Sequence, residues 1–179
     1  MVHAVFVSGS INAGKSTVAA LLSRMVPDGL FLDGDDFAPS DQPFEKRIVI
    51  GLARLVEAAL VESGKGRLVV VAYPLSAADW AAVTDAFARH RLDTRCITLA
   101  PPLSVALTNR GGRALSDWER SRIAEMYELG FARPSFGLIF DNSGEAPEAT
   151  ARRIHRALDL ATPGAPDTAS SSIRRMEKK

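Results

Sequence analysis

Short aliphatic runs alternate along the chain with longer stretches in which apolar residues recur at helical spacing. A continuous apolar run of about four to eight residues is typical of a buried strand, whereas recurrence every third or fourth residue indicates an amphipathic helix. The aliphatic runs predict strands at residues 2–8, 30–33, 67–72, 94–99 and 136–140. The regular alternation of strands and helices favours a parallel sheet covered on both faces, a three-layer α/β/α domain with five strands.

The predicted helices occupy the segments between these strands. Their ranges are 15–25, 44–63, 76–90, 101–110, 116–130 and 147–161. Ser76 and Ser116 are each followed three residues later by an acid, which is the spacing of a capping box. In the last helix we predict an apolar stripe formed by Ile154, Ala157, Leu158 and Ala161.

Composition indicates one folded domain. The chain has 179 residues and 46% hydrophobic content, enough for a full core. We expect this domain over residues 1–162. Residues 163–179 are small, polar and finally basic, so we expect a disordered tail there.

Charge and cysteine content narrow the partners. Lys plus Arg (22) nearly balances Asp plus Glu (21), which argues against a nucleic acid or an anionic membrane as partner. The single cysteine, Cys96, lies in an apolar run and is interpreted as a buried core thiol in a reducing compartment. No signal-peptide pattern or membrane-length apolar run is found. We expect a cytoplasmic protein, a monomer or weak homodimer, with a small-molecule partner.

A glycine-rich loop between the first strand and first helix carries the strongest chemical signal. Gly9, Gly14, Lys15 and Ser16 fit the pattern G-x-x-x-x-G-K-S/T. In that setting backbone N–H groups and a helix N-terminus surround a phosphate chain, the lysine reaches the β- and γ-phosphates, and the serine hydroxyl ligates Mg²⁺. We therefore predict ATP and Mg²⁺ as ligands, with Lys15 catalytic. The predicted nucleotide-binding residues of this loop are Gly9, Ser10, Ile11, Asn12, Ala13, Gly14, Lys15, Ser16 and Thr17.

A second cluster, Asp33, Asp35 and Asp36, follows the second strand, at the sheet edge where ligands of open α/β sheets bind. If this segment is extended, Asp33 and Asp35 point into one crevice and Asp36 points elsewhere. One carboxylate could serve the metal ion and another could accept the proton of an acceptor hydroxyl.

With both motifs, the sequence resembles the shikimate and gluconate kinase group of P-loop enzymes, within the nucleoside-monophosphate-kinase-like fold. The segment 31–37, F-L-D-G-D-D-F, looks like the D-G-D segment of gluconate kinases and adenylylsulfate kinases, and chloramphenicol phosphotransferases place a catalytic aspartate similarly. The resemblance implies a metal role for Asp33 and an acceptor-side base role for Asp35. Asp36 is kept as a second acceptor-side residue.

The resemblance also implies a short arginine-bearing lid over the phosphates, here at 109–116 with Arg110 and Arg113 as catalytic candidates. Arg120 and Arg122 are weaker lid candidates. It places Asn142 after the last strand at the adenine.

Two further residues are candidates for the acceptor site. Arg47 begins the long helix and could meet an anionic acceptor, while Tyr73 follows the third strand and could form the floor of the site. The sequence departs from the relatives here: it reads F-A-P at 37–39 where gluconate kinases have Phe-Leu-His-Pro, and A-Y-P at 72–74 where shikimate kinases have a glycine triplet. Neither sugar acid is therefore favoured as acceptor.

These residues predict an ATP-dependent phosphotransferase that moves the γ-phosphoryl group to a hydroxyl of a small molecule. An antibiotic-inactivating kinase and a nucleotide kinase remain variants of this hypothesis. A non-kinase nucleotide-binding regulatory protein is the alternative from another class, although the N-K-x-D motif of GTP switches is absent. A polynucleotide 5′-hydroxyl kinase would require a basic groove that the charge balance does not indicate.

Overall fold

The computed structural model describes residues 1–109 and 114–161. Strands and helices alternate almost throughout, as the hydrophobic pattern predicts. The elements are β1 (Ala4–Gly9), α1 (Lys15–Arg24), β2 (Leu30–Asp33), the 3₁₀ helix η1 (Gly34–Phe37), α2 (Phe44–Gly64), β3 (Val69–Ala72), α3 (Ala77–Arg89), β4 (Thr94–Leu99), α4 (Leu103–Ala106), α5 (Asp117–Glu128), β5 (Leu138–Phe140) and α6 (Pro147–Ala157).

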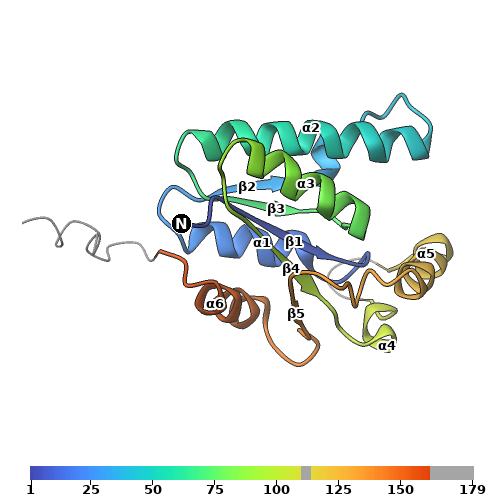
Figure 1. The fold of residues 1–179 in the computed structure, drawn as a ribbon. Coiled ribbons are helices and arrows are strands. Elements are labelled where there is room, and N and C mark those ends of the chain that lie inside the picture. The colour runs from blue at the N-terminus through green and yellow to red at the C-terminus, as the bar shows by residue number, and fades with distance from the viewer. Residues whose placement is uncertain (110–113, 162–179) are drawn as a thin grey trace, which may run out of the picture.

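The five strands form one parallel sheet in the order β2-β3-β1-β4-β5. Figure 1 shows α1 and α6 on one face of this sheet and α2 and α3 on the other. The predicted three-layer α/β/α class is therefore confirmed. Because all strands run the same way, their carboxyl ends meet at one edge, where β1 leads into α1 and β2 leads into η1.

The central strand β1 divides the core into two halves by simple alternation. Val5 and Val7 face the cluster that includes Val18 and Leu22 of α1, whereas Phe6 packs in the cluster on the opposite face. All six β1 residues are buried. A strand buried on both faces explains why its sequence is a continuous apolar run.

Both predicted capping boxes are present. The side chain of Ser76 accepts a hydrogen bond from the backbone N–H of Asp79, and that of Ser116 accepts one from the backbone N–H of Glu119. In return, the carboxylate of each acid accepts a hydrogen bond from the backbone N–H of its serine. The predicted burial of Cys96 is also confirmed: the residue is buried in β4, and burial raises the pKa of its thiol to about 12.

Three predictions about helices and turns need correction. The helix expected over 101–110 is a single turn, α4, because Asn12 and Arg120 bind the carbonyls that follow it. Of the stripe predicted for the last helix, Ile154 is buried and Leu158 is half-buried, but Ala157 at the end of α6 and Ala161 beyond it are exposed, and Leu160, also beyond α6, is buried instead. The segment after Asp33 is the helix η1 rather than an extended strand end.

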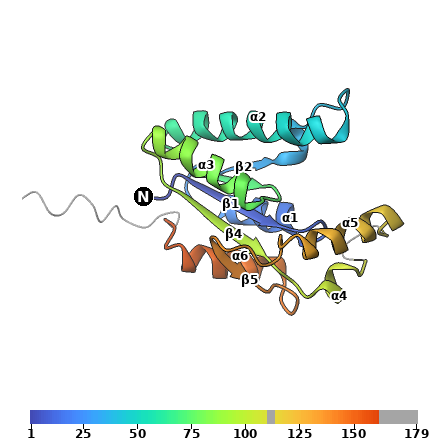
Figure 2. The same cartoon turned by 45° about the vertical axis from the view of Figure 1, so that its right-hand side comes forward.

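Several predicted features lie outside the described residues. They are Arg110 and Arg113 of the expected lid and the expected tail at 163–179. Within the part of the chain that the structure describes, no helix is both long and apolar enough to cross a membrane. The turned view in Figure 2 again places the amino end of α2 and the helix α5 beside the same edge of the sheet.

Candidate functional site

The glycine-rich loop adopts a conformation that depends on its two glycines. Gly9 has φ 131° and Gly14, the N-cap of α1, has φ 93°. A Cβ on Gly9 would lie 2.4 Å from the carbonyl oxygen of Leu99, so the backbone of β4 excludes any side chain there. The loop thus passes close to β4 and delivers the amino end of α1, with its unpaired N–H groups, into a cleft.

Lys15 begins α1 and turns back over the loop. Its Nζ donates to the carbonyl oxygen of Ser10 at 2.8 Å. Burial lowers the pKa of Lys15 to about 8, against the opposing influence of Asp35 and then Asp33, whose negative charges favour the protonated amine. The ammonium group and both carboxylates therefore share one electrostatic environment.

Asn12 connects the glycine-rich loop to the segment after α4. It has φ 63°, and its side-chain Nδ2 donates to the carbonyl oxygens of Ala106 at 2.8 Å and Thr108 at 2.9 Å. Arg120 of α5 binds the same segment, donating to the carbonyl oxygen of Leu107 at 2.6 Å. The loop, the end of α4 and the start of α5 are thereby joined.

This network bears on the weaker lid candidates. Besides the backbone carbonyl of Leu107, the guanidinium of Arg120 also binds the side chain of Asn109, donating to its Oδ1 at 3.4 Å. Arg122 pairs with Glu125 at 2.5 Å. Arg120 and Arg122 are thus both engaged in contacts within the protein. Arg110 and Arg113 fall outside the described residues.

The acidic cluster is organised by η1. Asp33 is the N-cap of this short helix, and its Oδ1 accepts a hydrogen bond from the backbone N–H of Asp35 at 3.2 Å. Asp33 and Asp35 do line the same cleft, as predicted, but η1 brings them together and not the alternation of an extended strand. Asp36 is exposed and is not among the residues that line it.

Tyr73 packs against the turn between the two aspartates. A Cβ on Gly34 would lie 2.2 Å from Tyr73 Cδ2, so the glycine leaves the space that the ring fills. The Tyr73 hydroxyl donates to the carbonyl oxygen of Ile48 in α2 at 3.3 Å. Burial first, and then Asp79 and Asp35, raise the pKa of Tyr73 to about 12, so the phenol stays protonated and serves as a wall.

The loop after β5 supplies the opposite side of the cleft. Asn142 is only 3% exposed, and its Nδ2 donates to the carbonyl oxygen of Ala13 at 3.0 Å. Its Oδ1 is buried and accepts no hydrogen bond from the described residues. Glu145, in the same loop, is bound by Arg153 at 2.6 Å and by Thr150 at 3.0 Å, which fixes the loop.

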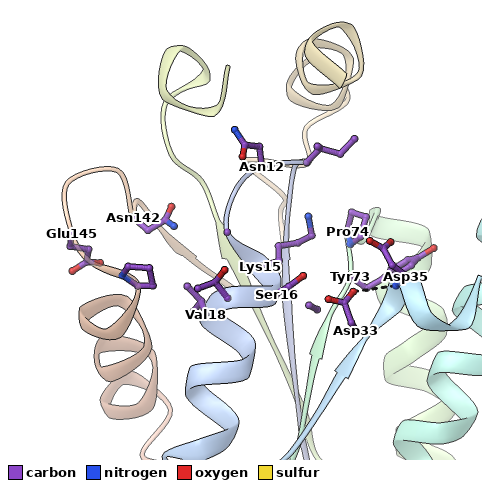
Figure 3. A pocket seen from close by; sticks show the side chains of 15 residues that line it. Asn12, Lys15, Ser16, Val18, Asp33, Asp35, Tyr73, Pro74, Asn142 and Glu145 are labelled. Atoms are coloured by element: carbon purple, nitrogen blue, oxygen red, sulfur yellow. Dashed lines mark hydrogen bonds between the residues drawn. The ribbon is translucent and has the colours of Figure 1, made fainter. Parts of the chain in front are cut away.

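These elements enclose a cleft of about 670 Å³ at the carboxyl edge of the sheet (Figure 3). Lys15 and Ser16 lie at its centre, Asp33, Asp35 and Tyr73 lie on one side, and Asn142 and Glu145 lie on the other. The predicted residues that line it are Ile11, Asn12, Gly14, Lys15, Ser16, Thr17, Asp33, Asp35, Tyr73 and Asn142.

The remaining predicted residues lie elsewhere. Gly9, Ser10 and Ala13 are buried in the loop beneath the cleft, and Arg47 in the first turn of α2 does not line it. Sequence reasoning missed five lining residues, namely Val18, Ala72, Pro74, Glu145 and Pro147. For Glu145 and Pro147, their place in the sequence could have predicted this: they follow the last strand, whose carboxyl end lies at the same edge of the sheet as the glycine-rich loop.

The donor set fits a magnesium ion bound together with phosphates. Ser16 supplies an exposed hydroxyl in the first turn of α1, and Asp33 lines the same cleft with a second carboxylate oxygen besides the one bonded to Asp35. Mg²⁺ usually takes one or two protein oxygens and completes its shell with water and substrate phosphates. The described residues contain no cluster of three or more acidic, His or Cys side chains that could hold a metal ion by themselves.

Comparison with known proteins gives a consistent result at the level of fold. No family description matches the sequence, and no curated protein matches it. Among solved structures, the Deinococcus radiodurans tunicamycin resistance protein superposes with a TM-score of 0.69 at 16% identity, covering 90% of this chain and 98% of that chain.

Two other structures represent groups that the sequence resembles. The Mycobacterium tuberculosis APS kinase, solved with AMPPNP and APS, gives a TM-score of 0.61 at 22% identity, covering 87% of this chain and 96% of that chain. A gluconokinase from Sinorhizobium meliloti 1021 gives a TM-score of 0.63 at 15% identity, covering 87% of this chain and 95% of that chain. With its five-stranded parallel sheet and its glycine-rich loop at the carboxyl edge, the chain has the fold of the P-loop small-molecule kinases.

Proposed function

We propose that this protein is an ATP- and Mg²⁺-dependent kinase that transfers the γ-phosphoryl group to a hydroxyl of a small-molecule acceptor. One observation carries the proposal: the ammonium of Lys15 and the carboxylates of Asp33 and Asp35 line the same cleft at the carboxyl edge of the sheet. A phosphate-binding cation on one side of a cleft and a carboxylate on the other are what an in-line transfer between two substrates requires.

The nucleotide side is formed by the glycine-rich loop and the loop after β5. Backbone N–H groups of residues 11–16 surround the phosphates, and Lys15 exchanges the carbonyl of Ser10 for phosphate oxygens. Asn142 binds the carbonyl oxygen of Ala13 through its Nδ2 and so fixes the loop after β5 against the glycine-rich loop, on the side of the cleft assigned to the nucleotide.

The acceptor side is formed by η1 and Tyr73. Asp35 accepts the proton of the attacking hydroxyl, and its exposure at the cleft gives an acceptor direct access. Asp33 and Ser16 hold the metal ion, which when bound neutralises charge on the transferring phosphoryl group. The hydrogen bond from the backbone N–H of Asp35 to Asp33 Oδ1 orients the Asp33 carboxylate relative to the turn that carries Asp35.

Two variants of the acceptor remain in the proposal. The similarity to a tunicamycin resistance protein favours an antibiotic as one acceptor class, and the APS kinase similarity favours a nucleotide as another. A regulatory protein that binds nucleotide and acts through a partner is the competing proposal from another class.

The test is a screen of ATP consumption against hydroxylated metabolites, nucleosides and antibiotics, with Lys15→Met as the inactive control. Acceptor-dependent ADP formation that disappears in Lys15→Met supports the kinase. Tight ATP·Mg²⁺ binding without consumption across the panel contradicts it and favours the regulatory protein.

A further inference from the structure

Two exposed aromatic rings meet where α2 approaches α5, outside the residues that line the cleft. Phe44, the first residue of α2, and Trp118, in the first turn of α5, have ring centroids 6.2 Å apart at an interplanar angle of 86°. Phe44 is 51% exposed and Trp118 is 59% exposed. Figures 1 and 2 both place the amino end of α2 and the helix α5 beside the carboxyl edge of the sheet.

A continuous path connects this pair to the proposed base. Tyr73, which lines the cleft beside Asp35, donates through its hydroxyl to the carbonyl of Ile48. Ile48 lies one helical turn after Phe44 and is itself 37% exposed, so the two apolar side chains share one face of α2. The Tyr73 hydroxyl thus joins the side of the cleft that holds Asp35 to α2, and Phe44 lies one turn nearer the start of that helix, against Trp118 and beyond the residues that line the cleft.

Both ends of the aromatic pair are fixed by other contacts. The capping box of Ser116 and Glu119 sets the first turn of α5, which contains Trp118. Arg120, in the same turn, is bonded to the carbonyl of Leu107. Two turns after Phe44, Gly51 of α2 lies close to Ala38, directly after η1: a Cβ on Gly51 would lie 3.3 Å from Ala38 Cα. The exposure of the rings is thus a property of a constrained surface.

An exposed pair of aromatic rings suits a ligand that presents an apolar face. Single exposed apolar side chains are common, but contiguous ones beside a cleft mark a place where a ligand or partner binds. Aromatic side chains recognise planar rings by offset or edge-to-face contact, which adds about 0.5–1.5 kcal/mol to the burial of apolar area. A planar ring on the ligand would therefore gain contact energy from Phe44 and Trp118 that a ligand without one would not.

We propose that Phe44 and Trp118 form the aromatic wall of the acceptor site, and that the acceptor carries its hydroxyl on a molecule with a planar, largely apolar ring. This inference rests on the proposed kinase function, because only a kinase has a phosphoryl acceptor. Binding of a ring-bearing ligand can nevertheless be measured without any turnover. It separates the acceptor from simple sugar acids, which present no such ring.

The binding experiment uses matched pairs of hydroxylated probes: phenyl and methyl β-glucosides, and adenosine with methyl β-riboside. Each is titrated into the protein loaded with a non-hydrolysable ATP analogue and Mg²⁺, and the fluorescence of Trp118 is followed as the difference between wild type and Trp118→Phe. We expect at least one ring-bearing probe to quench Trp118, with an affinity tenfold or more above that of its methyl partner.

Variants then assign the effect to the wall. Calorimetry should show a ring-bearing probe weakened about tenfold or more by Trp118→Ala and by Phe44→Ala, and less than about threefold by Trp118→Phe, which keeps a ring. Val61→Ala removes a similarly exposed side chain (53%) elsewhere on α2 and should change nothing. Far-ultraviolet circular dichroism and the unfolding midpoint of each variant check that it is folded.

The outcomes separate the inference from the function on which it rests. If ring-bearing probes bind no better than their methyl partners, or if Trp118→Ala binds them as well as wild type does, the aromatic wall is wrong. If ring-bearing probes bind in a Trp118-dependent way but stimulate no ADP formation, the wall stands and phosphoryl transfer is wrong. Stimulation of ADP formation by ring-bearing probes alone supports both.

Discussion

The ring of Tyr73 occupies the space that a side chain on Gly34 would need. A Cβ on Gly34 would lie 2.2 Å from Tyr73 Cδ2 and 3.0 Å from the carbonyl oxygen of Ala72. The glycine between Asp33 and Asp35 is therefore required by packing, since its φ is not in the left-handed region. One contact thus couples the third strand to the conformation of the acidic turn.

Replacing Gly34 by alanine should destabilise the protein by about 1–3 kcal/mol, the usual cost of adding a methyl group to a filled space. Urea unfolding measures this change, and turnover should fall as well because both aspartates move. Gly64→Ala is the matched control: it lies at the end of α2 with nothing within 4 Å of its Cβ. Equal stability of the two variants would show that the Tyr73 ring simply moves aside.

Lys15 should make ATP binding dependent on pH. Burial lowers the pKa of Lys15 to about 8 in the free protein, whereas bound phosphates favour its protonated form. ATP binding at pH 8 should therefore take up about half a proton at this group, and the affinity should fall as the pH rises through 8. Calorimetry in buffers of different ionisation enthalpy measures the uptake.

The lowered pKa of Lys15 also determines whether its contribution to stability rises or falls with pH. The pKa of Lys15 in the folded protein, about 8, lies below its ordinary value of 10.5, so the unfolded state binds more protons between these values. The contribution of Lys15 to the free energy of unfolding therefore rises with pH across that interval. Lys15→Met should remove both this slope and the proton uptake, while Lys65→Met, which removes an exposed lysine paired with Glu62, should leave both. Unchanged uptake in Lys15→Met would assign it to another group.

The sequence predicts much of the fold because hydrophobic periodicity and caps are local signals. All five strands and both capping boxes were recognisable in this way. The strand order β2-β3-β1-β4-β5 was not, because it depends on pairing between segments far apart in the chain. The short length of α4 was also missed, since a long-range hydrogen bond from Asn12 binds the backbone after it. The helical turn after Asp33 was missed as well, since it packs against the ring of Tyr73.

The candidate site shows the same division. The motif residues could be predicted because the glycine spacing encodes a backbone conformation that the structure contains at Gly9 and Gly14. Glu145 carries no such local signature, and it enters the cleft only because β5 ends at the same edge as β1. The contact between Phe44 and Trp118 joins two helices whose juxtaposition no local pattern encodes.

Asp35→Asn should separate the two sides of the proposed reaction. It keeps the shape of the side chain but removes its ability to accept a proton, so turnover should fall about a hundredfold or more while ATP·Mg²⁺ affinity barely changes. Steady-state kinetics with a found acceptor and calorimetry with ATP·Mg²⁺ make the comparison. Asp36→Asn, at an exposed neighbour that does not line the cleft, is the control and should alter neither quantity. Loss of ATP·Mg²⁺ affinity in Asp35→Asn, as severe as in Lys15→Met, would instead place Asp35 at the metal.

The hydrogen bonds from Asn12 to Ala106 and Thr108 should hold the glycine-rich loop against the end of α4. Asn12 has φ 63°, where glycine is unstrained and alanine costs about 1–2 kcal/mol. Asn12→Gly therefore removes the side-chain hydrogen bonds without adding backbone strain, whereas Asn12→Ala removes the same bonds and adds strain. We expect Asn12→Gly to raise the KM for ATP severalfold and lower the unfolding free energy by about 1 kcal/mol, with Asn12→Ala lower by a further 1–2 kcal/mol.

Arg91→Gly provides the matched control, because Arg91 has φ 57° and lies in the turn after α3. Relief of the left-handed backbone without loss of a loop contact should leave that variant as stable as wild type or more so, with an unchanged KM for ATP. Urea unfolding and ATP kinetics on the three variants isolate the part played by the amide. If Asn12→Gly matched Arg91→Gly in both measurements, the backbone conformation at residue 12 would matter and its bonds to the end of α4 would not.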